Sequence, residues 1–437
     1  MRILFKQMLC AAASLALACG MTPALPGIAL AGQPASQAEA AYQQASVSEA
    51  AAAIIKRIDR LPEAEDLVLG DKAAVTSIRT DYDALPYDDR QQVTNLPTLE
   101  AAEARIQALD EGSASTDATV DRLYGAVAYQ TALSIVDAAF GSDATCDNVV
   151  LARDDHYADA LSGSGLAGVL DAPLLLTHSD ELPSEVRTRI GQLHATHVYI
   201  LGGTVAVSSS VEEELESHGI EVSRICGDTI YETSLAISQK IVELGGSSDE
   251  AIVANPTAFQ DAVSASSFAY RYHVPILLQT WGDTAADRGY DQAGLDFLAG
   301  RECIVLGGAA AVSDDSVSSL DVVHRCAGAT AYDTSLAIAE YFVETGRLNA
   351  SSVSIASGIV PYMGVDALAA AAIAGRQGGV VLLAQPNGSY DYYSTAAPDA
   401  FIDAHKADVR QVHVLGGAVV MPDAFFTSVQ ERLNSGE

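Results

Sequence analysis

Three copies of one stretch decide how this chain folds. The first copy is VYILGGTVAVS at residues 198–208, the second is CIVLGGAAAVS at 303–313, and the third is VHVLGGAVVMP at 412–422. In each copy the apolar run predicts a buried strand, and the two glycines predict a sharp turn into a following helix. Repetition at a spacing of about 100 residues indicates that most of the chain is one structural unit written three times.

Each copy contains the same elements in the same order. An arginine with a glycine, tyrosine and threonine close behind it opens the copy, and a helix and a buried strand follow. An aspartate then starts a helix of small residues, before a second buried strand, a helix and the Gly-Gly strand. The opening arginines are Arg122, Arg224 and Arg325, and the aspartates are Asp159, Asp261 and Asp366.

This alternation of strands and helices predicts an α/β fold of three tandem, doubly wound units with mainly parallel sheets. The strands read as continuous apolar runs, which is typical of strands covered on both faces. We interpret each aspartate as a cap at a helix N-terminus, where a carboxylate accepts backbone N–H groups and the helix dipole favours negative charge.

One asymmetry predicts how the copies are joined. The first two copies run on into an extra strand-like segment that ends in Arg224 and Arg325, whereas the third copy stops at Glu437 without one. The segment 118–122, which precedes the first copy, has no other partner. We therefore expect the copies to close into a ring, in which this segment completes the third unit.

Composition excludes some classes of partner. The chain has 57 acidic and 24 basic residues, a formal net charge of −33. Nucleic-acid binding requires basic surface to neutralise phosphates, and adsorption to an anionic membrane requires the same. We therefore expect neither, and we attribute the charge to solubility and repulsion between copies of an exported protein.

The first 31 residues have the pattern of an export signal. Arg2 and Lys6 precede a short apolar run at 8–18, and Ala29-Leu30-Ala31 provides small residues for cleavage. Lipidation at Cys19 is an alternative. No other stretch is long and apolar enough to span a membrane. Residues 32–46, rich in Ala, Gln and Ser, are predicted to be a linker.

Residues 47–110 change to helical periodicity. Apolar residues at 54–61, 75–85 and 93–109 form three stripes that prolines separate, which predicts a small three-helix bundle. No catalytic grouping is visible there, and a second linker is predicted at 111–117.

Four cysteines remain after the signal. In an oxidising compartment Cys303 with Cys326 is the preferred pair, because the two lie close in sequence at neighbouring strand starts, and Cys146 with Cys226 follows by elimination. The alternative is four free, buried thiols.

In these motifs the chain resembles the cell-wall-binding repeat type 2 family, and its N-terminal helices resemble the three-helix spacer modules of Gram-positive surface proteins. The resemblance covers about 122–437, and we place the repeats at 118–223, 224–324 and 325–437. It implies Toprim-like or Rossmann-like units in a pseudo-threefold arrangement that hold a secreted protein non-covalently on an anionic wall polysaccharide or a teichoic-acid-like polymer.

The candidate ligand-binding residues are the recurring charged ones. They are Arg122, Arg153, Arg224, Arg325, Asp159, Asp261 and Asp366. For the three opening arginines the alternative is an ion pair at the contact between units.

The signals for catalysis are weak. Residues 163–168 match G-x-G-x-x-G, but the other copies have alanine and serine there, so close packing explains the small residues better than a dinucleotide. His194 with His197, and His156 near Asp155, lack a further ligand for zinc. No nucleophile motif is present. We expect no cofactor, no metal and no catalysis.

The sequence therefore predicts a non-catalytic surface protein attached to the Gram-positive wall. The alternatives are a wall hydrolase of amidase type, and an adhesin or surface-layer component that contacts other surface proteins through the bundle.

Overall fold

The structure is a computed structural model that describes residues 47–112, 118–282, 288–358, 364–386 and 394–435. The predicted export signal (1–31) and the first linker (32–46) lie outside the described residues, as does most of the second linker. Within the described ranges no helix is both long and apolar enough to cross a membrane.

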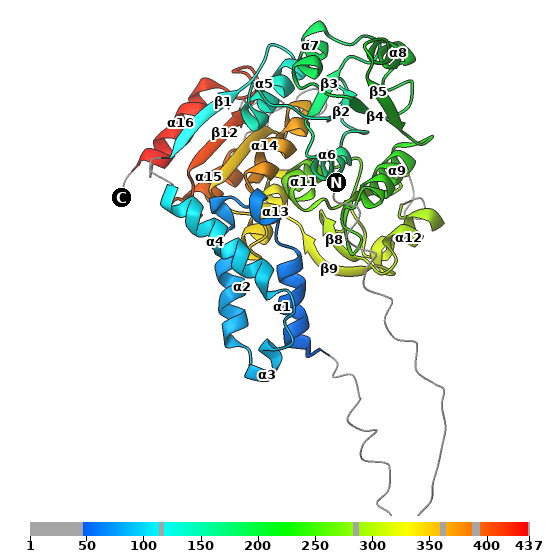
Figure 1. The fold of residues 1–437 in the computed structure, drawn as a ribbon. Helices are drawn as coiled ribbons and strands as arrows, with labels where there is room; N and C mark the ends of the chain where they lie inside the picture. Colours follow the sequence, from blue (N-terminus) through cyan, green and yellow to red (C-terminus); the bar gives the residue numbers. More distant parts are fainter. Residues whose placement is uncertain (1–46, 113–117, 283–287, 359–363, 387–393, 436–437) are drawn as a thin grey trace, which may run out of the picture. The chain divides into compact units, whose positions relative to one another are not determined.

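The N-terminal helices form the predicted bundle (Figure 1). Helices α1 (Glu49–Asp59), α2 (Lys72–Ala84) and α4 (Leu96–Gly112) pack around Ile58, Leu67 and Leu99, with short α3 (Tyr87–Arg90) between α2 and α4. The 3-10 turns η2 (Ala64–Asp66) and η3 (Leu69–Asp71) connect α1 to α2. Most of the core residues lie on the three predicted helical stripes, because that spacing places them on one face, while Leu67 joins the core from the connection between α1 and α2.

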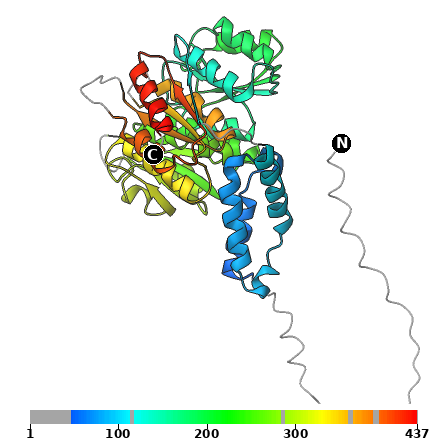
Figure 2. The ribbon, with the colours of Figure 1, turned by 90° about the vertical axis from the view of Figure 1, so that its left-hand side faces the viewer.

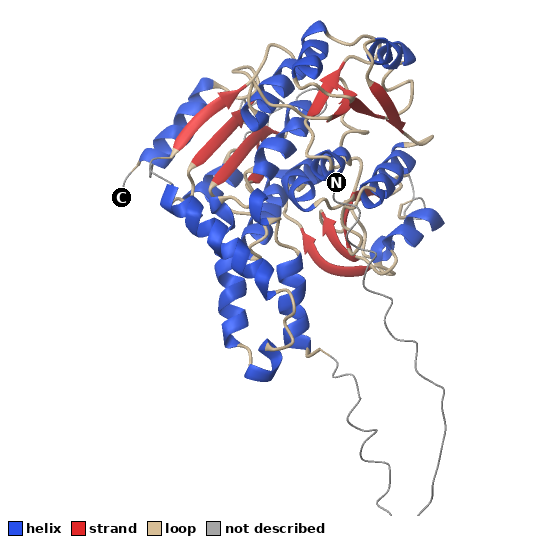
Figure 3. Cartoon of the chain, viewed as in Figure 1, coloured by secondary structure: helices blue, strands red, loops and turns tan. Residues whose placement is uncertain are grey.

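Three four-stranded parallel sheets follow (Figure 3), and they confirm the α/β fold class. The first sheet has the order β3-β2-β4-β5, the second β7-β6-β8-β9, and the third β11-β10-β12-β1. The strands of the first sheet are β2 (Asn148–Arg153), β3 (Leu174–Thr177), β4 (His197–Leu201) and β5 (Glu221–Ile225); those of the second are β6 (Glu250–Ala254), β7 (Ile276–Leu278), β8 (Glu302–Leu306) and β9 (Asp321–Cys326); those of the third are β10 (Ser352–Ser357), β11 (Val380–Ala384), β12 (Gln411–Leu415) and β1 (Thr119–Leu123).

The third sheet confirms the predicted ring closure. Strand β1, the first of the chain, pairs in parallel with β12, the last, in the register Thr119↔Gln411 to Leu123↔Leu415. β5 and β9 occupy the same edge position in their own sheets. The N-terminal segment therefore supplies the strand that the third copy lacks. The repeat boundaries proposed from the sequence stay predictions.

Helices cover both faces of each sheet, as the apolar strands require. They are α5 (Ala128–Phe140), α6 (Gly163–Val169), α7 (Ser184–Gln192) and α8 (Ser209–Ser217) in the first copy; α9 (Ile230–Glu243), α10 (Phe259–Ser264), α11 (Ser266–Tyr272), α12 (Gln292–Leu298) and η5 (Asp315–Val317) in the second; and α13 (Ala331–Glu344), η6 (Gly364–Ala369), α14 (Ala370–Arg376), α15 (Ala396–Ala404) and α16 (Asp423–Asn434) in the third.

The small residues of α6, α11 and α14 allow these three helices to pack closely against one another. A Cβ on Gly168 of α6 would lie 1.9 Å from the backbone oxygen of Tyr270 in α11, and one on Gly375 of α14 would lie 2.7 Å from the Tyr270 ring. Gly168 is the last glycine of the G-x-G-x-x-G match, so in this fold that glycine serves the contact between helices.

The bundle contacts the ring of sheets through ion pairs. Asp71 and Arg271 form a pair that is about 95% buried on both sides, and Arg60 donates to Glu302 at 2.8 Å. The acids on the ring, Glu250 and Glu302, lie opposite each other at the amino ends of β6 and β8. The residues at the equivalent positions are Asn148 and His197 in the first sheet, and Ser352 and Gln411 in the third. At this pair of positions the second sheet therefore has two carboxylates where the others have none, and Arg60 of the bundle contacts both. Figure 2 shows the bundle from another side.

The four cysteines are free thiols, so the predicted disulfides are wrong. Although Cys303 and Cys326 lie on neighbouring strands, Cys303 is opposite Val322 and Cys326 is opposite Leu306. The two thiols are therefore offset by three residues, about 10 Å along the strands, which is too far for a disulfide.

Candidate functional site: the carboxyl edges of the three sheets

The candidate residues gather where parallel strands end. In each sheet the chain first winds outward in one direction and then crosses to the other side, so the strand order reverses between β2 and β4, and likewise between β6 and β8 and between β10 and β12. In open α/β sheets the crevice outside the carboxyl ends at this point is the usual ligand site. The Gly-Gly turns follow β4, β8 and β12 directly.

Asp261 lies against the turn of the second sheet. It is 3% exposed, and one of its carboxylate oxygens lies 2.7 Å from the position that a Cβ on Gly307 would occupy. No hydrogen bond or ion pair to its carboxylate occurs within the described residues. Burial raises the pKa of this carboxyl to about 7. The prediction of a helix cap is wrong here: the cap residue of α10 is Ala258, and Asp261 lies inside the helix.

Asp159 occupies the matching place in the first sheet. A Cβ on Gly202 would lie 2.5 Å from one of its carboxylate oxygens. Burial raises the pKa of Asp159, while the positive charges of Arg153 and His156 act in the opposite direction. Asp159 precedes α6, whose cap residue is Ser162. The side chain of the third aspartate, Asp366, lies outside the described part of the structure.

The first glycine of each turn is required for two reasons. Gly202, Gly307 and Gly416 have φ values of 95°, 94° and 109°, a backbone conformation that side chains disfavour. In the first two sheets a side chain would also collide with the aspartate. The turn and the carboxylate are therefore one local structure.

The opening arginines lie on the edge strands β5, β9 and β1 and donate hydrogen bonds to the same glycine turns. Arg224 donates to Gly202 O at 3.0 Å and pairs with Glu212 at 2.7 Å. Arg325 donates to Gly307 O at 2.9 Å and pairs with Asp314 at 2.9 Å. The third arginine makes the equivalent contacts to Gly416 O at 3.3 Å and Asp423 at 3.1 Å, and this residue is Arg122.

Each arginine thus forms an ion pair with an acid that follows the turn in its own sheet. By the division into repeats, Arg224 opens the second copy and Glu212 belongs to the first, so this contact is the alternative that the sequence predicted, an ion pair between units. Arg153, the fourth candidate, pairs with Asp155 at 2.5 Å on the loop after β2. The structure brings Asp159 and Arg224 to the two sides of one turn, and it does the same for Asp261 and Arg325.

Sequence reasoning missed the polar residues at the ends of β3 and β7. In the first sheet His178 binds Asp154 at 2.8 Å and contacts the ring of Tyr129. In the second sheet Trp281 stacks on Arg288, with 3.8 Å from the guanidinium carbon to the ring centre. Their position directly after a predicted buried strand was the available signal. The edges therefore share the turn but differ in the chemistry around it.

A metal centre has no support in the described ranges, where no group of three or more histidine, cysteine, aspartate or glutamate side chains could hold an ion.

The sequence of each copy matches a family model. The model is that of cell wall binding domain 2 (CWB2), and it matches residues 122–212, 224–317 and 325–426. The chain belongs to the CWB2 family. The N-terminal bundle lies outside these matches, so its resemblance to a surface-protein module stays a prediction.

Two curated proteins of Bacillus subtilis are similar to part of this chain. The chain is 28% identical to the N-acetylmuramoyl-L-alanine amidase LytC over 267 residues, and 31% identical to the amidase enhancer over 268 residues. Each match covers 61% of this chain, but only 50% of LytC and 34% of the enhancer. The chain thus spans half or less of the length of these relatives.

Two solved structures from Clostridium difficile have the same fold. Cwp6 has a TM-score of 0.61 at 23% identity, covering 72% of this chain and 48% of the other. Cwp8 has a TM-score of 0.63 at 22% identity, covering 78% and 56%. The family and the fold together establish cell-wall binding as the role of the repeat region.

Proposed function

We propose that the protein is secreted and attaches non-covalently to a Gram-positive cell wall by binding an anionic wall polymer, without catalysing a reaction. The observation that carries the proposal is the threefold repetition of one carboxyl edge, in a chain whose first strand closes the ring. Three similar edges held on one body bind a repeating polymer with high effective concentration, so weak single contacts sum to firm attachment.

The charges support recognition by short-range contacts. A net charge of −33 repels an anionic polymer at long range, although screening limits this repulsion to about 8 Å at physiological salt. The three opening arginines already donate hydrogen bonds to the backbone oxygens of the glycine turns, and each pairs with a carboxylate. The proposal therefore requires attraction at short range, through hydrogen bonds and ion pairs that form only when the polymer touches the protein.

Co-sedimentation of the full chain with purified walls tests the proposal. Walls are compared before and after acid extraction, which removes secondary polymers. Binding to untreated walls that falls after extraction is the expected result, and equal binding to both would remove the anionic polymer as the ligand. A zymogram on peptidoglycan tests the catalytic part, because a clearing zone would contradict a non-catalytic protein.

A further inference from the structure

A groove of about 1090 Å³ separates helix α2 from the third sheet. One wall is the exposed side of α2, and the other is formed by the amino ends of β1, β10 and β12 with the chain before them. The groove lies at the opposite ends of the strands from the Gly-Gly turns. Its volume is slightly above the usual range of ligand pockets in proteins, about 300–1,000 Å³.

The α2 wall begins at the charged Lys72, and the α2 residues that line the groove beyond it are uncharged. Ala73, Thr76, Ser77 and Thr80 recur at helical spacing and are exposed, and all four line the groove. No carboxylate of α2 lines it, although the chain has 57 acidic residues. This face of α2 therefore presents three hydroxyl groups and the small side chain of Ala73 to the groove.

The opposite wall is a hydrogen-bonded set of hydroxyl and amide groups. Ser352 donates to the Gln377 oxygen at 2.5 Å, and Gln377 donates to the Gln411 oxygen at 3.3 Å. The buried ring of His413 contacts Gln377 at 3.2 Å from behind. These partners fix the direction in which the amides face. In the second sheet the positions of Ser352 and Gln411 carry the two glutamates that bind the bundle.

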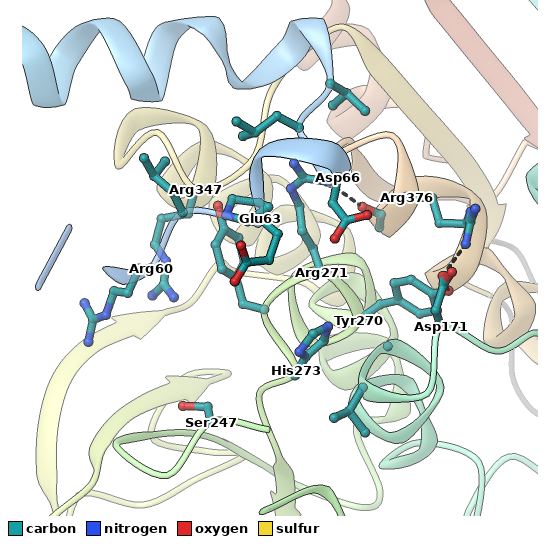
Figure 4. A pocket seen from close by; sticks show the side chains of 18 of the residues that line it. Arg60, Glu63, Asp66, Asp171, Ser247, Tyr270, Arg271, His273, Arg347 and Arg376 are labelled. Atoms are coloured by element: carbon teal, nitrogen blue, oxygen red, sulfur yellow. Dashed lines mark hydrogen bonds and ion pairs between the residues drawn. The ribbon is translucent and has the colours of Figure 1, made fainter. Parts of the chain in front are cut away.

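A second cavity beside the bundle differs from the groove because charged side chains dominate its lining. It has about 740 Å³, and seven carboxylates and five arginines line it (Figure 4). Four of its five arginines form ion pairs; among them, Arg347 binds Glu250 at 2.6 Å, and Arg376 binds Asp171. In the α2 groove Asp408 is the single carboxylate among the lining residues, and Arg410 has no acidic partner among the described residues.

We propose that the α2 groove binds a glycan segment through the hydroxyl groups of its sugars, with Arg410 beside any acidic substituent. Sugar hydroxyls both donate and accept, which matches serine and threonine hydroxyls and side-chain amides. The inference rests on the proposed function, and it gives the bundle a part in the binding site. Because most of the contacts are uncharged, binding at this groove changes little with salt.

A matched pair of substitutions in the full chain tests the groove. Ala73→Trp places a large ring in it, while Ala52→Trp makes the same change at an exposed alanine of α1 outside it. Circular dichroism and melting temperature check that both variants fold. The readout is the dissociation constant for purified walls, untreated and acid-extracted, at low and high salt.

The expected result is that Ala73→Trp weakens binding about tenfold or more, while Ala52→Trp binds like the wild type. A defect confined to untreated walls identifies the secondary polymer as the source of the glycan, and a defect that persists after extraction identifies the peptidoglycan strand. Wild-type affinity in Ala73→Trp, or equal losses in both variants, overturns the groove while wall binding stands. A wild-type chain that binds no wall overturns the proposed function and the groove together.

Discussion

The buried carboxyl of Asp261 makes the stability of this protein depend on pH in an unusual direction. Its pKa rises from 3.8 to about 7 on folding, because burial penalises the charged form and none of the described residues compensates for it with an ion pair or a hydrogen bond. Between pH 4 and 7 the native state therefore binds a proton that the unfolded state has released. The free energy of unfolding must fall as pH rises through this window and become level above it.

The substitution Asp261→Asn removes this contribution. A shift of about 3 pKa units corresponds to about 4 kcal/mol at pH 8, and to about 1.5 kcal/mol at pH 5. Asparagine has nearly the same shape and carries no charge. We therefore expect the variant to gain stability over the wild type by about 2.5 kcal/mol more at pH 8 than at pH 5.

Urea-induced unfolding at pH 5 and pH 8 measures the difference. Asp88→Asn serves as the control, because Asp88 is exposed in the bundle, and we expect it to change stability by less than about 0.5 kcal/mol at both pH values. A variant that is destabilised at pH 8, or whose stability differs from the wild type equally at both pH values, would show that the Asp261 carboxylate is ionised and well solvated in the native protein. The account of the turn would then be wrong.

Three further changes test other parts of the structure. Gly307→Ala is expected to cost about 2 kcal/mol or more in urea unfolding, because of its φ of 94° and its contact with the aspartate, whereas the neighbouring Gly308→Ala should be nearly neutral. Asp71→Asn leaves Arg271 buried without its charge partner and should cost about 3–5 kcal/mol, seen as easier proteolytic release of the bundle, while replacing both residues with apolar ones should restore most of the loss. A chain that starts after β1 (Thr119–Leu123) should melt lower than one that keeps this strand, and equal melting temperatures would contradict ring closure.

The candidate site could be predicted in part. The sequence marked Asp159, Asp261 and the opening arginines as equivalent positions, and the structure places them around equivalent turns. Their partners could not be predicted, because the cap, ion-pair and ligand interpretations suit the same residue types. A change of one or two residues along a helix decides whether an aspartate caps it or faces a glycine.

The sequence by itself determined whatever is local or repeated: the α/β alternation, the three helices of the bundle, the glycine turns and the strand missing from the third copy. Each of these depends on side-chain periodicity or backbone freedom, which a short stretch contains. Only the tertiary structure decided which residues face one another across the chain. It offset Cys303 from Cys326 along paired strands, and it buried the Asp261 carboxylate beside the Gly307 turn. It also set the bundle against Glu302 rather than its counterparts His197 and Gln411, because charge complementarity acts only once distant segments have met.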